Sequence, residues 1–358
     1  MSLLPAHLLL LVAEHAEFAT IQALRATCKG NRSILDHYER AVTRLNAARY
    51  PCAPCNHILA SDTREREVLP KYTFEILREL ETRQRNIEEI VHGAYLAFRD
   101  EHDLRDVSKA DTIRANLKRA LWQCSKIADL ETHSITYRDD IVPRRDPCVK
   151  SLINQDIMLR DAPPPDGWHL ALKEVHESNR RDVRFRQISH VRDLPSQELA
   201  GIMVVAHLTS QGYMRSRAPR SGASRPEIVE MGICMAENTI RHGVFFLQSN
   251  IRGDGDASHH AKLLLDDTYD EMRRWEAGDP SVLPGLTMNV AVTLCQKIGC
   301  EHRDMLSAAC TLVRGDLWRP ADAEKQEAEP EAEREKPAGG ALQDVSEGAE
   351  EGPEEHAA

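Results

Sequence analysis

The chain has 358 residues, of which 41% are hydrophobic, 29% charged and 5% aromatic, and its formal net charge is −11. Residues 321–358 contain 13 Asp and Glu against 3 Lys and Arg, a net of −10, so residues 1–320 carry about −1. Because this larger part is nearly neutral, it has no broad basic field to attract phosphates, which excludes nucleic acid as an expected partner.

The first predicted element is a helix that begins at Pro5, where the missing N–H of proline is not needed. Leu8, Leu9 and Val12 follow at a spacing that places them on one apolar stripe. The apolar run 8–13 is far too short to span a bilayer, and no Lys or Arg precedes it as a secretion signal requires. We therefore expect a cytoplasmic and/or nuclear protein with no membrane partner, whose nine cysteines are reduced.

Two further helices are expected to complete an N-terminal module over residues 1–47. Thr20 is the predicted N-cap of the second helix, which carries Ile21 and Leu24. The third helix is predicted from apolar residues at helical spacing, namely Ile34, Leu35, Tyr38, Val42 and Leu45. Two prolines between residues 50 and 55 then interrupt any helix.

Residues 48–320 are expected to form an irregular multi-helix domain, because aromatic residues are scarce and β-branched runs are few. Ser108 followed by Asp111 predicts a capping box at the start of a helix that runs through Cys124. Other helices are predicted from apolar spacing over 73–99, 196–208, 226–247, 258–276, 287–298 and 303–313. Weak strand alternation occurs in two stretches, Ser134–Tyr137 and Val183–Val191.

Three segments of unusual composition punctuate the chain. A proline-rich stretch at 162–167 marks a division of the multi-helix region into two subdomains. Residues 214–226 carry four arginines among Ser, Gly and Pro, a pattern typical of a solvated mobile loop that also fits a recognition or phosphorylation loop. Residues 321–358 lack the large apolar side chains that would offset chain entropy, so we predict a disordered acidic tail.

The metal candidates are incomplete. Cys52 and Cys55 have the spacing of a zinc-binding pair, and His57 lies nearby. No second pair of matching spacing exists, and only the fold could add further ligands, such as Cys295, Cys300 and His302. We therefore predict buried or idle thiols, with no metal and no cofactor.

Catalytic motifs fail at the residues that would do the chemistry. His176-Glu177 begins like the zinc-protease helix motif, but Arg180 occupies the position of the second His ligand. Residues 254–256 begin like a calcium loop, but His259 stands where that loop needs Gly. The sequence contains neither a Gly-x-Ser-x-Gly elbow nor a phosphate loop. We predict a non-catalytic protein.

The order of residues at the N-terminus resembles the F-box, a small helical domain whose consensus runs roughly Leu-Pro-x-Glu-Leu-Leu, then Ile, then Leu-Arg-x-x-Cys-Arg/Lys. The chain has the same order at Leu4, Pro5, Leu8, Leu9, Val12, Ile21, Leu24, Arg25, Cys28 and Lys29. The segment between the Leu-Pro half of the motif and its Leu-Arg-x-x-Cys-Lys half fits the consensus without an insertion. The continuation through Tyr38-Glu39 is similar to that of filamentous-fungal F-box proteins.

This resemblance implies a substrate-recruiting adaptor of a cullin–RING (SCF-type) ubiquitin ligase. The chain would dock onto a Skp-type adaptor protein and, through it, a cullin, while residues 48–320 would recruit an unknown protein substrate. The contact would be a helix laid in an apolar groove. The partner-binding residues implied by the motif are Leu4, Pro5, Leu8, Leu9, Val12, Ile21, Leu24 and Cys28.

Two alternatives stay open at the level of sequence. In a helical structural or scaffold protein, residues 1–47 would merely complete the core, and Leu8, Leu9 and Val12 would be inaccessible to solvent. In an enzyme built from scattered His, Cys and acidic residues, a pocket would gather several of those side chains.

Overall fold

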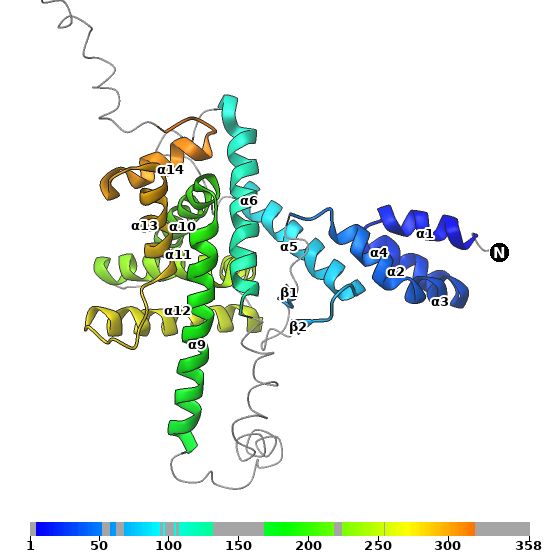
Figure 1. Ribbon diagram of the computed structural model, residues 1–358, viewed down its shortest axis with the longest axis horizontal. Helices are drawn as coiled ribbons and strands as arrows, with labels where there is room; N and C mark the ends of the chain where they lie inside the picture. The colour runs from blue at the N-terminus through cyan, green and yellow to red at the C-terminus, as the bar shows by residue number, and fades with distance from the viewer. Residues whose placement is uncertain are drawn as a thin grey trace, which may run out of the picture. The chain divides into compact units, whose positions relative to one another are not determined.

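The computed structural model describes a helical chain (Figure 1). The described residues are 5–51, 58–61, 68–93, 96, 104, 107–131, 168–217, 224–253 and 255–318. They form twelve α-helices, two 3₁₀ turns and two short strands, which confirms the all-α class. The described residues up to Trp318 belong to one compact unit. Among the described helices, none has the combination of length and apolar sequence that a membrane span requires.

Four short helices form the N-terminal part, where the sequence predicts three. They are α1 (Ala6–His15), α2 (Phe18–Thr27), α3 (Lys29–His37) and α4 (Glu39–Ala47). The predicted third helix is broken at Tyr38, whose backbone (φ −101°, ψ 12°) leaves the helical conformation. The helices enclose a core that also takes two side chains from α5 (Phe74–His92); its members are Leu9, Ala13, Ile21, Leu35, Val42, Phe74 and Leu77.

The predicted N-cap of α2 is wrong. This helix begins at Phe18 after Glu17, and Thr20 lies inside its first turns. The backbone N–H of Phe18 donates to the carboxylate of Glu81 in α5. Because a distant side chain satisfies the start of α2, the helix needs no local Ser or Thr cap.

A short antiparallel strand pair, which the sequence does not predict, follows α4. It pairs β1 (Ile58–Leu59) with β2 (Val68–Leu69). The Leu59 carbonyl accepts from Arg83 Nη2 at 2.7 Å, and the Leu59 N–H donates to Asp129 Oδ1 at 3.2 Å. Since Arg83 belongs to α5 and Asp129 ends α6 (Ala110–Asp129), polar side chains of two helices fix this strand pair.

The predicted capping box before α6 is also wrong. Ser108 lies in a 3₁₀ turn, η1 (Val107–Lys109), which leads directly into the helix. Lys109 is the N-cap, and its own side chain forms no cap hydrogen bond. The chain therefore enters α6 through a 3₁₀ turn, which is common at helix termini.

Six helices remain, and all but the first of them in chain order lie close to predicted segments. They are α9 (Trp168–Asp193), α10 (Ser196–Arg217), α11 (Arg225–Arg252), α12 (Gly255–Glu276), α13 (Leu286–Ile298) and α14 (Met305–Val313), with the 3₁₀ turn η2 (His302–Asp304) before α14. The weak strand prediction over 183–191 is wrong, because this stretch lies inside α9. Its buried residues Gln187, Ile188 and Val191 recur at helical spacing.

The main core lies where α6, α10 and α11 pack against one another (Figure 1). Helix α11 is kinked at Gly243, whose backbone (φ 64°, ψ −151°) is not helical. A Cβ atom at Gly243 would lie 2.9 Å from Ser125 Cα and 3.0 Å from the Cys124 carbonyl oxygen. Glycine at this position thus allows the backbones of α11 and α6 to come into direct contact.

Several sequence predictions concern residues outside the described ranges. These are the zinc-pair residues Cys52, Cys55 and His57, the strand prediction over 134–137, the division at 162–167, the acidic tail at 321–358, and Leu4 of the F-box-like motif. Within the arginine-rich stretch 214–226, residues 218–223 are likewise not described.

Candidate functional site

An apolar strip lies exposed on α1. Leu8, Leu11 and Val12 are 41%, 53% and 46% exposed, and their spacing places them on one side of the helix. We call these three residues the α1 strip. Pro5, which precedes the helix, is exposed as well. Three half-exposed large apolar side chains in little more than one helical turn are a feature of docking helices.

The opposite side of α1 is buried. Leu9 and Ala13 are 0% exposed and pack in the N-terminal core, where Ile21 of α2 is also 0% exposed. Of the partner-binding residues that the motif implies, Leu9 and Ile21 are therefore core residues, while Leu11, absent from that list, belongs to the α1 strip.

Two other residues of the motif have local structural roles. Leu24 is half-buried and packs against the N-terminal core. Cys28 is half-buried, and its Sγ accepts from the Asn31 N–H at 3.3 Å, so it caps the start of α3. Neither side chain contributes to the α1 strip.

Polar contacts hold α1 in place from its C-terminal end. Asn46 Nδ2 donates to the Ala13 carbonyl at 2.8 Å, and Arg49 Nη2 donates to the His15 carbonyl at 2.7 Å. These bonds satisfy carbonyl groups that a helix end leaves without partners. The α1 strip is therefore presented by a helix that is fixed to its neighbours.

Arg25, which occupies the Arg position of the motif, connects three helices. Its Nη2 lies 2.6 Å from Asp36 Oδ1 in α3, and its guanidinium lies 4.9 Å from the ring centroid of Phe74 in α5. The stacked and paired guanidinium joins α2, α3 and α5 around the N-terminal core.

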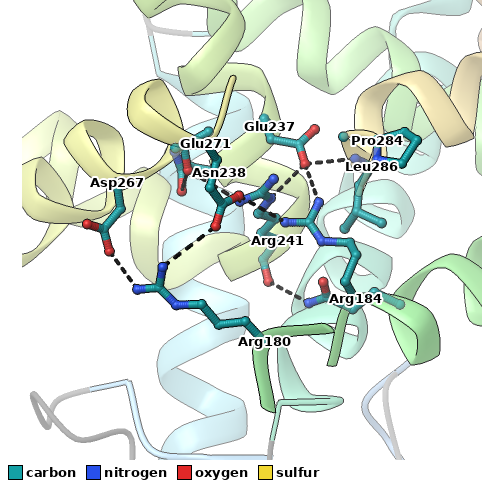
Figure 2. Close-up of polar contacts among 12 residues, drawn as sticks. Arg180, Arg184, Glu237, Asn238, Arg241, Asp267, Glu271, Pro284 and Leu286 are labelled. Carbon is teal, nitrogen blue, oxygen red and sulfur yellow. Dashed lines mark hydrogen bonds and ion pairs between the residues drawn. The ribbon is translucent and has the colours of Figure 1, made fainter. Parts of the chain in front are cut away.

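Four charged side chains meet beside the main core, and we call them the charge cluster (Figure 2). Its members are Arg184 of α9, Glu237 and Arg241 of α11, and Glu271 of α12. Glu237 Oε1 lies 2.6 Å from both Arg184 Nη1 and Arg241 Nε. Glu271 Oε2 lies 2.6 Å from Arg241 Nη1. Two positive and two negative charges are thus brought together, with Arg184, Glu237 and Arg241 almost fully buried.

Glu237 also caps α13 from a distance. Its carboxylate accepts from the backbone N–H groups of Leu286 at 2.7 Å and Thr287 at 2.8 Å, and from Thr287 Oγ1 at 2.8 Å. Burial alone would raise the pKa of Glu237, but Arg241, Arg184 and these N–H groups outweigh burial and hold the pKa well below its ordinary value. The carboxylate is ionised and its oxygens are fully engaged, so Glu237 is a structural anion and is unsuited to proton transfer.

The two arginines of the charge cluster respond differently to burial. Burial, and after it the nearby Arg241 guanidinium, lower the pKa of Arg184 to about 10, although Glu237 and Glu271 oppose the shift. For Arg241 the carboxylates of Glu237 and Glu271 outweigh burial and raise the pKa. Both side chains stay charged near neutral pH, and together they connect α9, α11 and α12.

A second buried ion group joins α5 to α6. Arg83 Nε lies 2.7 Å from Glu79 Oε1, and its Nη1 lies 2.7 Å from Asp129 Oδ2. Burial would lower the pKa of Arg83, but the two carboxylates outweigh it and raise the pKa. Because the same guanidinium also binds Leu59 of β1, these contacts position the strand pair rather than form a reactive centre.

Acid is expected to weaken the charge cluster. The pKa values of Glu237 and Glu271 lie below the ordinary 4.5, so their stabilising contribution is complete above about pH 5 and is lost as pH falls below about 4.5. In Glu237→Gln the group at this position cannot titrate. Urea unfolding of both chains between about pH 7 and about pH 4 should show the gap in unfolding free energy shrinking with acid; a constant gap would contradict this account.

Of the metal candidates, the structure brings two thiols together. Cys295 Sγ and Cys300 Sγ lie 3.6 Å apart, at the end of α13 and just beyond it, while His302 lies in η2. Among the residues that the structure describes, no three His, Cys, Asp or Glu side chains are grouped so that they could share a metal ion.

Sequence reasoning did not find the charge cluster or Leu11. Glu237 and Arg241 have i, i+4 spacing, a local signal of an ion pair, but Arg184 is 53 residues from Glu237.

Comparisons with protein-family models, with curated proteins and with solved structures find no match for this chain.

Proposed function

We propose that this chain is a substrate-recruiting adaptor of an SCF-type ubiquitin ligase, and that it docks onto a Skp-type adaptor protein through the α1 strip. The observation that carries the proposal is the exposure of Leu8, Leu11 and Val12 on a helix whose Leu9 and Ala13 are fully buried. The strip lies in the segment whose Leu-Pro to Cys-Lys order resembles the F-box.

The energetics of the α1 strip suit a groove contact. Each of its side chains has about half of its surface exposed, so burial against an apolar groove would contribute about 1 kcal/mol per residue. The ligase component needs no reactive group of its own, because holding a substrate near a charged ubiquitin carrier raises the effective concentration of the reacting groups.

The test is capture of the full chain by a Skp-type adaptor. We expect Leu8→Glu combined with Val12→Glu to weaken binding by at least about 30-fold, because two anchors are lost and two charges would enter an apolar groove. Glutamate is a good helix former, so α1 itself should persist. Co-purification and binding titration would measure the effect.

The matched control is Met288→Glu combined with Val292→Glu. These two residues have the same i, i+4 spacing on α13 and are 50% and 42% exposed. The control and the wild-type chain should be captured equally, and all three chains should show the same thermal unfolding. Equal capture of the α1 variant, or no capture of the wild-type chain, would favour the alternative of a helical scaffold protein.

A further inference from the structure

The end of α13 places two thiols side by side. The helix ends at Ile298, and Gly299 follows in the left-handed conformation (φ 65°, ψ 35°). The Cys300 N–H then donates to the Cys295 carbonyl at 3.2 Å. In this type of helix end, the residue after the glycine contacts the residue one turn back in the helix. Here both of these residues are cysteines.

The two cysteine side chains are in direct contact. The two sulfurs are 3.6 Å apart, and the Cys300 S–H donates to Cys295 Sγ. A disulfide needs a sulfur separation of about 2.05 Å and α-carbons about 4.4 to 6.8 Å apart. A backbone hydrogen bond already joins the two residues, so closing the disulfide requires the two sulfurs to approach by about 1.5 Å.

The two thiols differ in their expected roles. Burial, the neighbouring Cys295 thiol and Asp304 raise the pKa of Cys300 to about 12, so Cys300 keeps its proton and remains the donor. Cys295 Sγ accepts the hydrogen bond from Cys300, so we take Cys295 as the attacking sulfur and Cys300 as the resolving sulfur. Both side chains are half-buried, whereas Cys124 and Cys234 are fully buried.

We propose that Cys295 and Cys300 form an oxidation site, at which hydrogen peroxide converts the dithiol into a reversible intramolecular disulfide. The Cys295 thiolate attacks one peroxide oxygen, the O–O bond breaks, and hydroxide leaves, which takes up a proton to give water. The resulting Cys295 sulfenic acid is attacked by the Cys300 sulfur, the S–O bond breaks, and a second water leaves. The net reaction consumes two thiols and one peroxide and yields one disulfide and two waters.

Reduction restores the dithiol by thiol–disulfide exchange with a small thiol. The nearby resolving sulfur also protects Cys295, because condensation to a disulfide competes with further oxidation to sulfinic acid. This inference stands independently of adaptor docking, since it depends only on the end of α13.

The experiment uses the full chain carrying Cys52→Ser and Cys55→Ser, so that the Cys-x-x-Cys pair cannot exchange with the site. After treatment with hydrogen peroxide, free thiols are blocked with N-ethylmaleimide, and the digest is analysed by mass spectrometry without reduction. We expect a peptide in which Cys295 and Cys300 are joined, unblocked and lighter by two hydrogens, and we expect a thiol reductant to reverse this change.

Two variants separate the roles of the sulfurs. In Cys300→Ser, Cys295 should react with dimedone after peroxide treatment, several-fold more than in the parent chain, because its sulfenic acid has no resolving thiol. In the control Cys28→Ser, which keeps a capping oxygen for α3, the disulfide should form as in the parent chain. Blocking of both Cys295 and Cys300 by N-ethylmaleimide after peroxide, or no gain of dimedone labelling in Cys300→Ser, would overturn the proposal.

Discussion

Replacing Glu237 by alanine is expected to lower the free energy of unfolding by about 4 kcal/mol, because the change leaves Arg184 and Arg241 buried without their shared carboxylate. It also removes the acceptor for the first N–H groups of α13. For a chain of this size the midpoint of thermal unfolding should fall by roughly 10 °C. Urea unfolding followed by circular dichroism would measure the loss.

Two variants test whether burial of the charge cluster causes the loss of stability expected for Glu237→Ala. Glu237→Gln keeps an oxygen that can accept from Leu286 and Thr287, so it should destabilise the chain less than alanine does. Asp267→Ala removes the partner of Arg180 at 3.0 Å, but both side chains are more than half exposed, so about 0 to 1 kcal/mol is expected. Equal losses for Glu237→Ala and Asp267→Ala would refute the assignment of Glu237 as the central anion of the charge cluster.

Replacing Gly243 by alanine is the second change with a large expected effect. The backbone at Gly243 (φ 64°, ψ −151°) is strained for any residue with a Cβ atom, and that atom would lie 2.9 Å from the backbone of Ser125. Strain and steric overlap together should cost about 3 kcal/mol or more. Thermal and urea unfolding would show this cost as a lower midpoint.

Gly278→Ala is the control for backbone strain alone. Gly278 also has a positive φ of 80°, but a Cβ atom there would meet no atom within 4 Å. We expect a loss of about 1 kcal/mol, from conformational strain without overlap. If the two alanine variants were equally stable, the close approach of α11 to α6 at the kink would be ruled out as an energetic constraint.

The positions of most helices could be predicted from local apolar spacing. The segment predicted at 287–298 is α13 (Leu286–Ile298), and the one at 258–276 is α12 (Gly255–Glu276). A helix that buries one side repeats its apolar residues with the helical period, and this signal lies entirely within the segment. The strand prediction at 183–191 failed because a short alternating pattern occurs within α9 by chance.

Helix starts and strand pairing were missed because distant residues determine them. The start of α2 depends on Glu81 of α5, and the strand pair depends on Arg83 and Asp129. The charge cluster has the same character, since Arg184 meets Glu237 only after α9 packs against α11. The sequence around each of these residues does not show which distant residue it will contact.

The α1 strip shows what spacing cannot decide. Positions 8–13 are apolar without interruption, so the sequence does not indicate which side of the helix faces the core. The neighbouring α4 decides this, because Asn46 binds the Ala13 carbonyl and Val42 packs in the same core as Leu9. The sequence therefore located the helix that carries the α1 strip, but it assigned Leu9 to the accessible side and omitted Leu11.

Helix α5 belongs to two cores at once. Phe74 and Leu77 close the N-terminal core, whereas Ile76, Leu80 and Ile87 belong to the main core. A fragment that stops after residue 47 would therefore be an open bundle with its apolar interior in contact with water. A fragment meant to keep the N-terminal core closed has to extend at least through Leu77, and binding measurements with a shorter peptide would describe an incomplete fold.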